Sequence, residues 1–323
     1  MRQGRNGAEL RPFCRPAGVK HRSYSGRLQR GLTDFGAEVS FGRAVARVRE
    51  HDGIPVPVEA VRQHTLRHGK AIATLRETPP DTPAQTLITQ RDGSLIPVRQ
   101  PGRGADARKG RRLFWREVRL CSARGAGPTP PLYGATLGSV ETAAWLWRAT
   151  AQAAGLGAST AVHGIGDGAP WIVDQFTENF GPQGRYLPDF YHVSAYPAAA
   201  AQVVNPKNPK PWLHRQQGRL LENKGAEVLR ALPPHQEAPD AATQPVRAAY
   251  QYLHQRREHL DYAAARAKDL PLGSGEIESG HRHVLQQRLK LAGCWWKQTH
   301  AQARLNLRTA RANNLWNSYW SKN

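Results

Sequence analysis

The chain has 323 residues, enough to bury a full core and to divide into two or three structural units. Its 46 Lys and Arg outnumber 25 Asp and Glu, and this net charge of +21 favours a polyanionic partner, with nucleic acid first among the candidates. No apolar run reaches the length of a membrane span, and the start MRQGRNGAEL lacks the apolar core of a secretory signal. Cys14, Cys121 and Cys294 lie far apart, which excludes a disulfide framework and a zinc finger. We therefore expect a soluble cytoplasmic protein that binds DNA and has no membrane partner.

The predicted elements begin after a basic, Gly- and Arg-rich segment at 1–38, whose weak periodicity predicts a poorly ordered tail or an arm that contacts DNA. Helical periodicity starts at Phe41, breaks at His51-Asp52-Gly53 and resumes near Pro57. Two short helices joined by a Gly-containing turn are the outline of a helix-turn-helix, so 39–75 is a candidate DNA-binding unit, although many helical hairpins share this outline. The residues of the second helix that we expect to face DNA are Arg62, Arg67 and Lys70.

The pattern changes after a Pro/Thr-rich linker at 76–86. In chain order it predicts strands at 92–98, 113–123 and 131–138, a helix at 139–155, a strand at 159–167, a helix at 170–180 and a strand at 185–196. Three meandering strands followed by helical crossovers predict an α/β fold with a mixed sheet flanked by helices. We divide this part into a first core segment at 87–197, a helical insertion at 198–272 and C-terminal core helices at 273–323.

Three acids stand at positions where core elements meet loops. Asp92 opens the first predicted strand, Asp167 ends the fourth, and Glu278 lies in the first turns of the last long helix. They can converge only if the first and fourth strands are neighbours and the last helix packs across them. Each also has an ordinary structural explanation, because Asp-Gly pairs are common in turns and acids are favoured near helix N-termini. Glu276 is the alternative to Glu278 if the phase of the helix differs.

Such a cluster would suit phosphoryl-transfer chemistry. Three carboxylates can hold Mg2+ while leaving room for water and phosphate oxygens. Two ions about 4 Å apart would activate the attacking oxygen and stabilise the leaving oxygen of an in-line displacement. We therefore expect two Mg2+ ions as cofactors, with Mn2+ able to substitute. The glycines on either side of Asp167 would let a phosphate backbone approach closely.

Several strings occur in a specific order between about residues 92 and 320: RDGSLIPV, REVRL, GDGAPWI, LPDFYHVS, GSGEIESGHRHV, QQRLKLAGCWW and LNLRTARANNLW. In these motifs the chain resembles DDE transposases of bacterial insertion sequences, specifically the ISKra-type subgroup. The combination of GDGAPWI, then DFYH about 20 residues later, then GSG-x-x-ES and RLK carries most of the resemblance, since each motif alone is common.

The resemblance implies a ribonuclease H-like catalytic core in which Asp92, Asp167 and Glu278 bind the metals. It implies DNA cleavage that frees a 3′-hydroxyl, followed by attack of that hydroxyl on target DNA, by a homo-oligomer that pairs two element ends in the bacterial nucleoid. Asp189 and His192 look like an acid-x-x-His pair that supports the site, the alternative being a strand-end Asp beside an ordinary His. The residues implied to meet the DNA backbone are Arg282, Arg288 and Lys290.

The sequence departs from the family pattern after DFYHVS, where Ala195-Tyr196-Pro197 replace the usual acid and His, and its N-terminal region is short. Two further hypotheses therefore stay open. One is a transposase-derived DNA-binding protein without catalysis, and the other is a nuclease of the same fold that only hydrolyses DNA.

Overall fold

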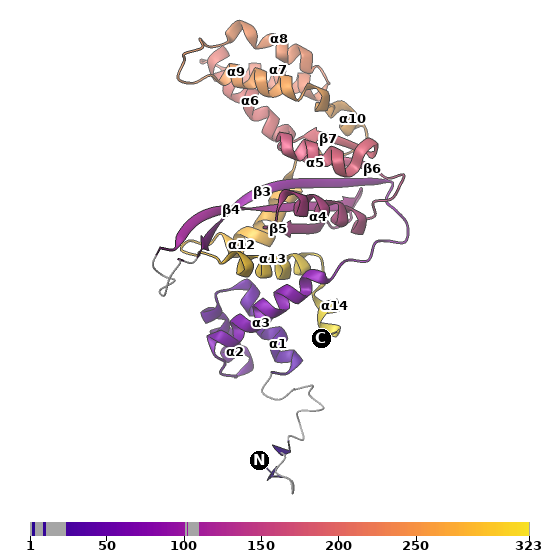
Figure 1. The fold of residues 1–323 in the computed structure, drawn as a ribbon. Coiled ribbons are helices and arrows are strands. Elements are labelled where there is room, and N and C mark those ends of the chain that lie inside the picture. Colours follow the sequence, from indigo (N-terminus) through magenta and orange to yellow (C-terminus); the bar gives the residue numbers. More distant parts are fainter. Residues whose placement is uncertain (1, 4–8, 11–23, 101, 103–109, 323) are drawn as a thin grey trace.

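A five-stranded sheet forms the centre of the computed structural model, which describes residues 2–3, 9–10, 24–100, 102 and 110–322 (Figure 1). Its strands are β3 (Thr86–Gln100), β4 (Arg112–Gly125), β5 (Leu132–Thr136), β6 (Ala161–Gly166) and β7 (Gly184–Pro188). Near the N-terminus, β1 (Arg2–Gln3) and β2 (Glu9–Leu10) form a separate antiparallel pair. Among the described residues, no helix is both long and apolar enough to span a membrane.

The strand order in the sheet is β5-β4-β3-β6-β7. The first three strands form an antiparallel meander, and β6 and β7 then add in parallel on the other side of β3. The two parallel connections need crossovers, which the helices between β5, β6 and β7 supply on one face, and C-terminal helices cover the other face. This is the ribonuclease H-like α/β architecture, so the predicted fold class is confirmed.

Helices α4 (Val140–Ala153) and α5 (Pro170–Phe180) cover one face of the sheet, where Trp147 and Phe176 pack in an aromatic core. The other face is covered by α11 (Gly275–Gly280), the π-helical segment η5 (His281–Gln286), α12 (Gln287–Leu289) and α13 (Gln298–Ala312). The final helix, α14 (Trp316–Ser321), packs back on the N-terminal helices. The predicted helix at 170–180 is confirmed at both ends, with Pro170 in its first turn.

The first core strand is longer than predicted, and Asp92 lies inside it rather than at its start. The N-terminal half of the strand contains Thr89, Gln90 and Arg91, which do not form an apolar strand pattern in the sequence. Their side chains are nevertheless all buried. Each has a partner within the core: Thr89 accepts from the Trp147 indole at 2.6 Å, Gln90 accepts from the amide of Ile277 at 2.8 Å, and Arg91 donates to Gln175. A central strand can therefore carry polar residues where its neighbours supply partners.

Three helices form the N-terminal unit: α1 (Gly26–Glu38), α2 (Phe41–Asp52) and α3 (Val58–Ala71). The helix pair predicted within 39–75 is confirmed. The expectation of a tail throughout 1–38 is wrong for Gly26–Glu38, because Ser25 caps α1 and Leu32 and Ala37 are fully buried. The rest of that predicted tail lies largely outside the described residues.

The predicted fifth strand is too long. Strand β7 ends at Pro188, and Asp189 caps a helix, α6 (Phe190–Val204), that leads into the insertion. The remaining insertion helices are α7 (Pro209–Leu221), α8 (Gly225–Ala231), α9 (Pro245–Gln255) and α10 (Tyr262–Ala267). They have a hydrophobic core of their own and lie at the β7 side of the sheet, away from the N-terminal helices (Figure 1).

Candidate active site

One cavity of about 400 Å³ lies at the edge of the sheet where β6 and β7 end. Asp92, Asp167 and Glu278, the three acids singled out from the sequence, all line it, together with Asp189 and His192. They come from β3, from the turn after β6, from α11 and from the start of α6. Four carboxylates therefore share one solvent-accessible space.

The sheet register explains the approach of Asp92 and Asp167. Gln90 of β3 pairs with Ile165 of β6, and each acid lies two residues further along its own chain. Neighbouring strands lie about 4.8 Å apart, so the two residues leave the ladder side by side. The condition stated from the sequence, that the first and fourth strands are neighbours, is met.

The backbone holds the Asp167 turn tightly. The Asp167 carboxylate accepts a hydrogen bond from the amide of Ala169 at 2.8 Å. Gly168 has φ of 77°, a left-handed conformation that glycine adopts without strain, and α5 starts two residues later at Pro170. The Gly-Asp-Gly sequence is thus a strand-to-helix turn that leaves the Asp167 side chain half-buried at the cavity.

The helical insertion also holds this turn, through contacts that are not predictable from local sequence patterns. From α9, the Tyr252 hydroxyl donates to the carbonyl of Asp167 at 2.8 Å, and Arg256 Nε donates to the carbonyl of Gly168 at 2.8 Å. Tyr186 of β7 accepts from the amide of Gly168 at 3.1 Å. Burial raises the pKa of the Tyr252 phenol well above its usual range, so the hydroxyl stays protonated and can donate.

The two acids at the start of α11, Glu276 and Glu278, point in different directions and have different roles. Glu276 accepts from Ser122 at 2.8 Å and from Arg124 at 2.6 Å, which binds α11 to β4. Glu278 is exposed and faces the cavity. The amide of the intervening Ile277 donates to Gln90 at 2.8 Å, so β3 fixes the start of the helix beside Asp92. Glu276 has a structural role, whereas Glu278 has no side-chain partner among the described residues.

Asp92 has a partner that sequence reasoning missed. Its Oδ2 lies 3.1 Å from Nε2 of His281, a side chain that is only 5% exposed, and its Oδ1 accepts from the amide of Gly93. His281 is the first residue of the π-helical segment, one turn after Glu278. The GHRH string carried the signal, since a His three residues after an acid lies on the same side of a helix.

Asp189 and His192 are linked through the backbone, not through their side chains. Asp189 Oδ1 accepts from the amide of His192 at 2.9 Å, the usual geometry of a helix N-cap. Asp189 Oδ2 accepts from the amide and the hydroxyl of Ser274 at 2.5 and 2.6 Å, which ties β7 to the loop before α11. The His192 ring instead contacts Tyr196 and Tyr252. The acid-x-x-His spacing therefore reflects a helix N-cap. The capping residue, Asp189, also positions the helix of Glu278 through Ser274.

The candidate DNA-binding residues of α3 lie together. Arg62, Arg67 and Lys70 line one open depression on the surface of the N-terminal unit. Arg62 is paired with Glu59 on the same helix at 2.7 Å, whereas Lys70 is exposed. The opposite flank of α3 packs on α13, where the carbonyl of Gly69 accepts from Asn306. The helix thus presents a single basic side to solvent.

The candidates near Glu278 divide differently. Arg282 and Lys290 are exposed, as expected of residues that meet a DNA backbone. Arg288 is only 2% exposed and stacks on Trp296, so the expectation for this residue is wrong. The π-helical segment is the physical reason, because a π-helix needs more residues per turn and changes the side on which later residues lie.

The chemistry of the donors fits a hard divalent cation, since all four acidic side chains at the cavity offer oxygen. Asp189 accepts from Ser274, Asp92 lies 3.1 Å from the His281 ring, and Asp167 uses one oxygen to accept from the amide of Ala169. Within the described part of the chain, no three His, Cys, Asp or Glu side chains are grouped closely enough to hold one ion. Asp167 and Glu278 are therefore the carboxylates with the most freedom to bind a cation.

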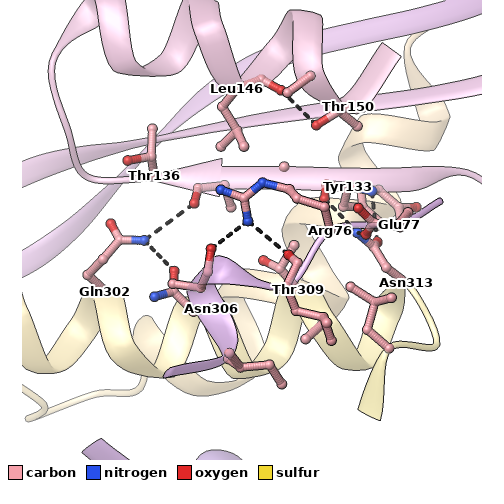
Figure 2. A pocket seen from close by; sticks show the side chains of 18 of the residues that line it. Arg76, Glu77, Tyr133, Thr136, Leu146, Thr150, Gln302, Asn306, Thr309 and Asn313 are labelled. Atoms are coloured by element: carbon pink, nitrogen blue, oxygen red, sulfur yellow. Dashed lines mark hydrogen bonds between the residues drawn. The ribbon is translucent and has the colours of Figure 1, made fainter. Parts of the chain in front are cut away.

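A second cavity, of about 290 Å³, lies between α4, β5 and α13 (Figure 2). Arg76 extends across this cavity and donates to the carbonyl of Leu75, and the rest of the lining mixes apolar side chains with neutral polar ones such as Gln302 and Asn306. The acid in the lining, Glu77, accepts from Asn313. This cavity offers no cluster of acids or nucleophiles comparable to that around Asp167.

Comparison with known proteins identifies no family for this chain. No protein-family model matches the chain, and no curated protein matches it. A solved structure described as the Drosophila P element transposase strand transfer complex is similar with a TM-score of 0.33 and 9% sequence identity. The similarity covers 96% of this chain and 83% of that chain.

Proposed function

We propose that this protein is a DNA transposase that cuts and joins phosphodiester bonds with divalent cations at the Asp92, Asp167 and Glu278 cavity. The observation that supports it most is the meeting of one acid from each of three separate elements at a single accessible cavity in a ribonuclease H-like fold. The net charge of +21 supplies an affinity for DNA that a small-molecule hydrolase would not need.

In this proposal Asp167 and Glu278 would hold Mg2+, with Asp92 as the third carboxylate ligand. The bound ions would supply Lewis-acid stabilisation of charge at the scissile phosphate and an activated oxygen nucleophile. The surrounding residues position the ligands: Tyr252 and Arg256 hold the Asp167 turn, and Gln90 and Asp189 hold the start of α11. Four carboxylates repel one another, so cation binding relieves an electrostatic cost.

A DNA-binding protein without catalysis is the second candidate, and one observation favours it. Among the described residues, the acids are not grouped as a formed metal site, and a buried histidine ring lies 3.1 Å from Asp92. The survival of an acid at each of the three positions favours the catalytic proposal, because a protein that only binds DNA gains nothing from a cluster of negative charges.

The test uses the purified protein with supercoiled plasmid and with duplexes taken from the DNA that flanks its coding region. We expect nicks and joined strands in 5 mM Mg2+ or Mn2+, and neither product in excess EDTA. Nicks without joined strands would indicate a nuclease. DNA binding in a mobility-shift assay, without any metal-dependent cutting, would establish the non-catalytic candidate and exclude the transposase.

The hold of the insertion on Asp167 gives a further prediction. Tyr252→Phe removes one hydrogen bond to the Asp167 carbonyl but keeps the ring packed against Tyr196, at 3.8 Å between centroids. Loss of a hydrogen bond of about 1 kcal/mol loosens the turn, so we expect the Mn2+ concentration for half-maximal cleavage to rise about fivefold. Initial rates measured across a Mn2+ titration check this.

Tyr250→Phe is the matched control, because Tyr250 lies on the same helix and its ring stacks on His254. It should leave the Mn2+ dependence unchanged. An equal shift in both variants, or none in Tyr252→Phe, would contradict a positioning role for the insertion.

A further inference from the structure

An exposed aromatic face lies on the distal half of the β3–β4 hairpin. Trp115 of β4 is 60% exposed and Trp295, which precedes α13, is 40% exposed, with 6.4 Å between their ring centroids. Leu95 and Leu113 are each 51% exposed and lie on the same side of the hairpin by strand register. Exposed large apolar side chains gathered in this way mark an interaction surface.

The backbone fixes the two tryptophans beside each other. Pro97 lies opposite Trp115 in the antiparallel register. On the other edge of β3, the amide of Trp296 donates to the carbonyl of Pro97 at 3.1 Å, and the amide of Arg99 donates to the carbonyl of Trp296 at 2.7 Å. Trp296 points inward and is buried, so the adjacent Trp295 must point outward, to the side of Trp115. The face is thus a built part of the sheet.

The charge around the face identifies the kind of partner. In segments 93–100, 110–119 and 287–298 every charge is positive except that of Glu117, which pairs with Arg119 at 2.8 Å. A second copy of this chain also carries +21 and would be repelled, whereas a nucleic-acid backbone would be attracted. Aromatic rings surrounded by cations are the surface that unpaired bases stack on.

We propose that Trp115 and Trp295 form a platform that binds unpaired bases of single-stranded DNA. Bases within a duplex are already stacked on their neighbours, so only unpaired ones can stack on the two rings. Trp115 lies on β4 opposite Pro97, and Pro97 is five residues along β3 from Asp92, which corresponds to about 16 Å of strand rise. The role of the platform beside the site depends on the transposase proposal, but its DNA binding does not.

The experiment measures the affinity of the full chain for labelled DNA in EDTA, so that no cleavage intervenes. The probes are a blunt duplex and the same duplex with a ten-nucleotide single-stranded extension. Stacking on one aromatic ring contributes enough that Trp115→Ala should weaken binding to the extended probe about tenfold or more. Binding to the blunt duplex should change less than about twofold, because phosphate contacts supply it.

Trp145→Ala is the matched control: Trp145 is 57% exposed on α4, and Arg76 stacks on it at 5.5 Å. It should leave both affinities unchanged. An equal loss for both probes in Trp115→Ala, or no loss, would overturn the platform. So would sedimentation showing that wild type self-associates without DNA and that Trp115→Ala abolishes this association, since the face would then be an interface between copies. Absent cleavage in Mg2+ would instead count against the transposase proposal alone.

Discussion

Replacement of Asp167 by Asn is expected to lower metal-dependent DNA cleavage by about three orders of magnitude, equivalent to about 4 kcal/mol of transition-state stabilisation. Asn has the shape of Asp, and its carbonyl oxygen can still accept the hydrogen bond from the amide of Ala169. The turn should therefore persist while the negative oxygen ligand is lost. Initial cleavage rates in Mg2+ and Mn2+, with DNA affinity measured in parallel, check the prediction.

Asp174→Asn is the matched control, since Asp174 is an exposed acid on α5, the helix that follows the turn. It removes the same charge without touching the cavity, so cleavage should stay within about twofold of wild type. DNA affinity should be similar in both variants, because removing a negative charge does not weaken phosphate contacts. Undiminished cleavage by Asp167→Asn would show that this acid has no role in catalysis.

The core elements were predictable because their local signals agree with their packing. Pro170 begins a helix where proline fits best, and the run around Val162 and Ile165 is a short apolar strand buried on both faces. Sequence spacing does not set strand order, so the sequence could show only that the acids converge if the first and fourth strands are neighbours. The pairing of β3 with β6 met that condition.

The failures share a cause: side chains whose burial depends on partners distant in sequence. In the sequence Arg91 looks like a loop residue, but in the structure its guanidinium stacks on Trp147 and Trp171 at 5.1 and 5.0 Å. Arg288 reads as a DNA contact until the π-helical segment turns it onto Trp296. Tyr252 reads as an ordinary helix residue until its hydroxyl meets Asp167, 85 positions away. No local periodicity encodes such contacts.

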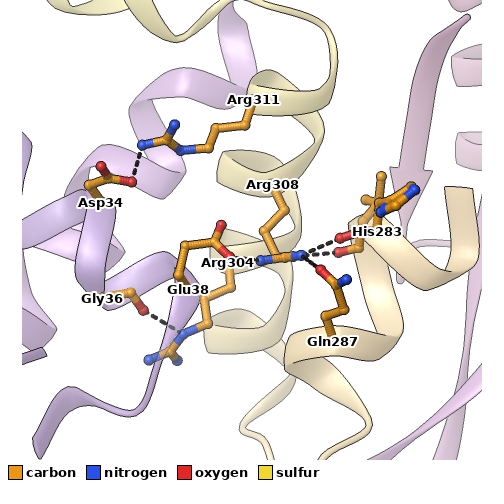
Figure 3. A network of polar contacts seen from close by, with 9 residues as sticks. Asp34, Gly36, Glu38, His283, Gln287, Arg304, Arg308 and Arg311 are labelled. Atoms are coloured by element: carbon orange, nitrogen blue, oxygen red, sulfur yellow. Dashed lines mark hydrogen bonds and ion pairs between the residues drawn. The ribbon is translucent and has the colours of Figure 1, made fainter. Parts of the chain in front are cut away.

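The buried arginines of α13 give the second prediction with a large expected effect. Figure 3 shows Arg304, Arg308 and Arg311 reaching from this helix toward α1, where Arg308 meets Glu38 and Arg311 meets Asp34. On its other side Arg308 donates to the carbonyl of Val284 at 2.8 Å and to that of His283, both in the π-helical segment that follows Glu278. One guanidinium thus joins the N-terminal unit to the helix of the candidate site.

We expect Arg308→Leu to lower the free energy of unfolding by about 3 kcal/mol, because it leaves two carbonyls and Glu38 without their donor in a region where Arg308 is 6% exposed. Urea unfolding followed by tryptophan fluorescence measures this. Arg311→Leu is the comparison, since the Arg311 and Asp34 side chains are 34% and 35% exposed. Solvent screens that pair, so its loss should cost about 1 kcal/mol or less.

The same change should reach the site. With the carbonyls of His283 and Val284 released, the π-helical segment can relax toward an α-helix, which would turn His281 away from Asp92 and shift Glu278. Cleavage by Arg308→Leu should therefore fall about tenfold or more at a temperature where the protein is still folded, while Arg311→Leu keeps its rate. Normal cleavage in a folded but destabilised Arg308→Leu would show that this arginine serves stability alone, and that the N-terminal unit and the Glu278 helix are not coupled through it.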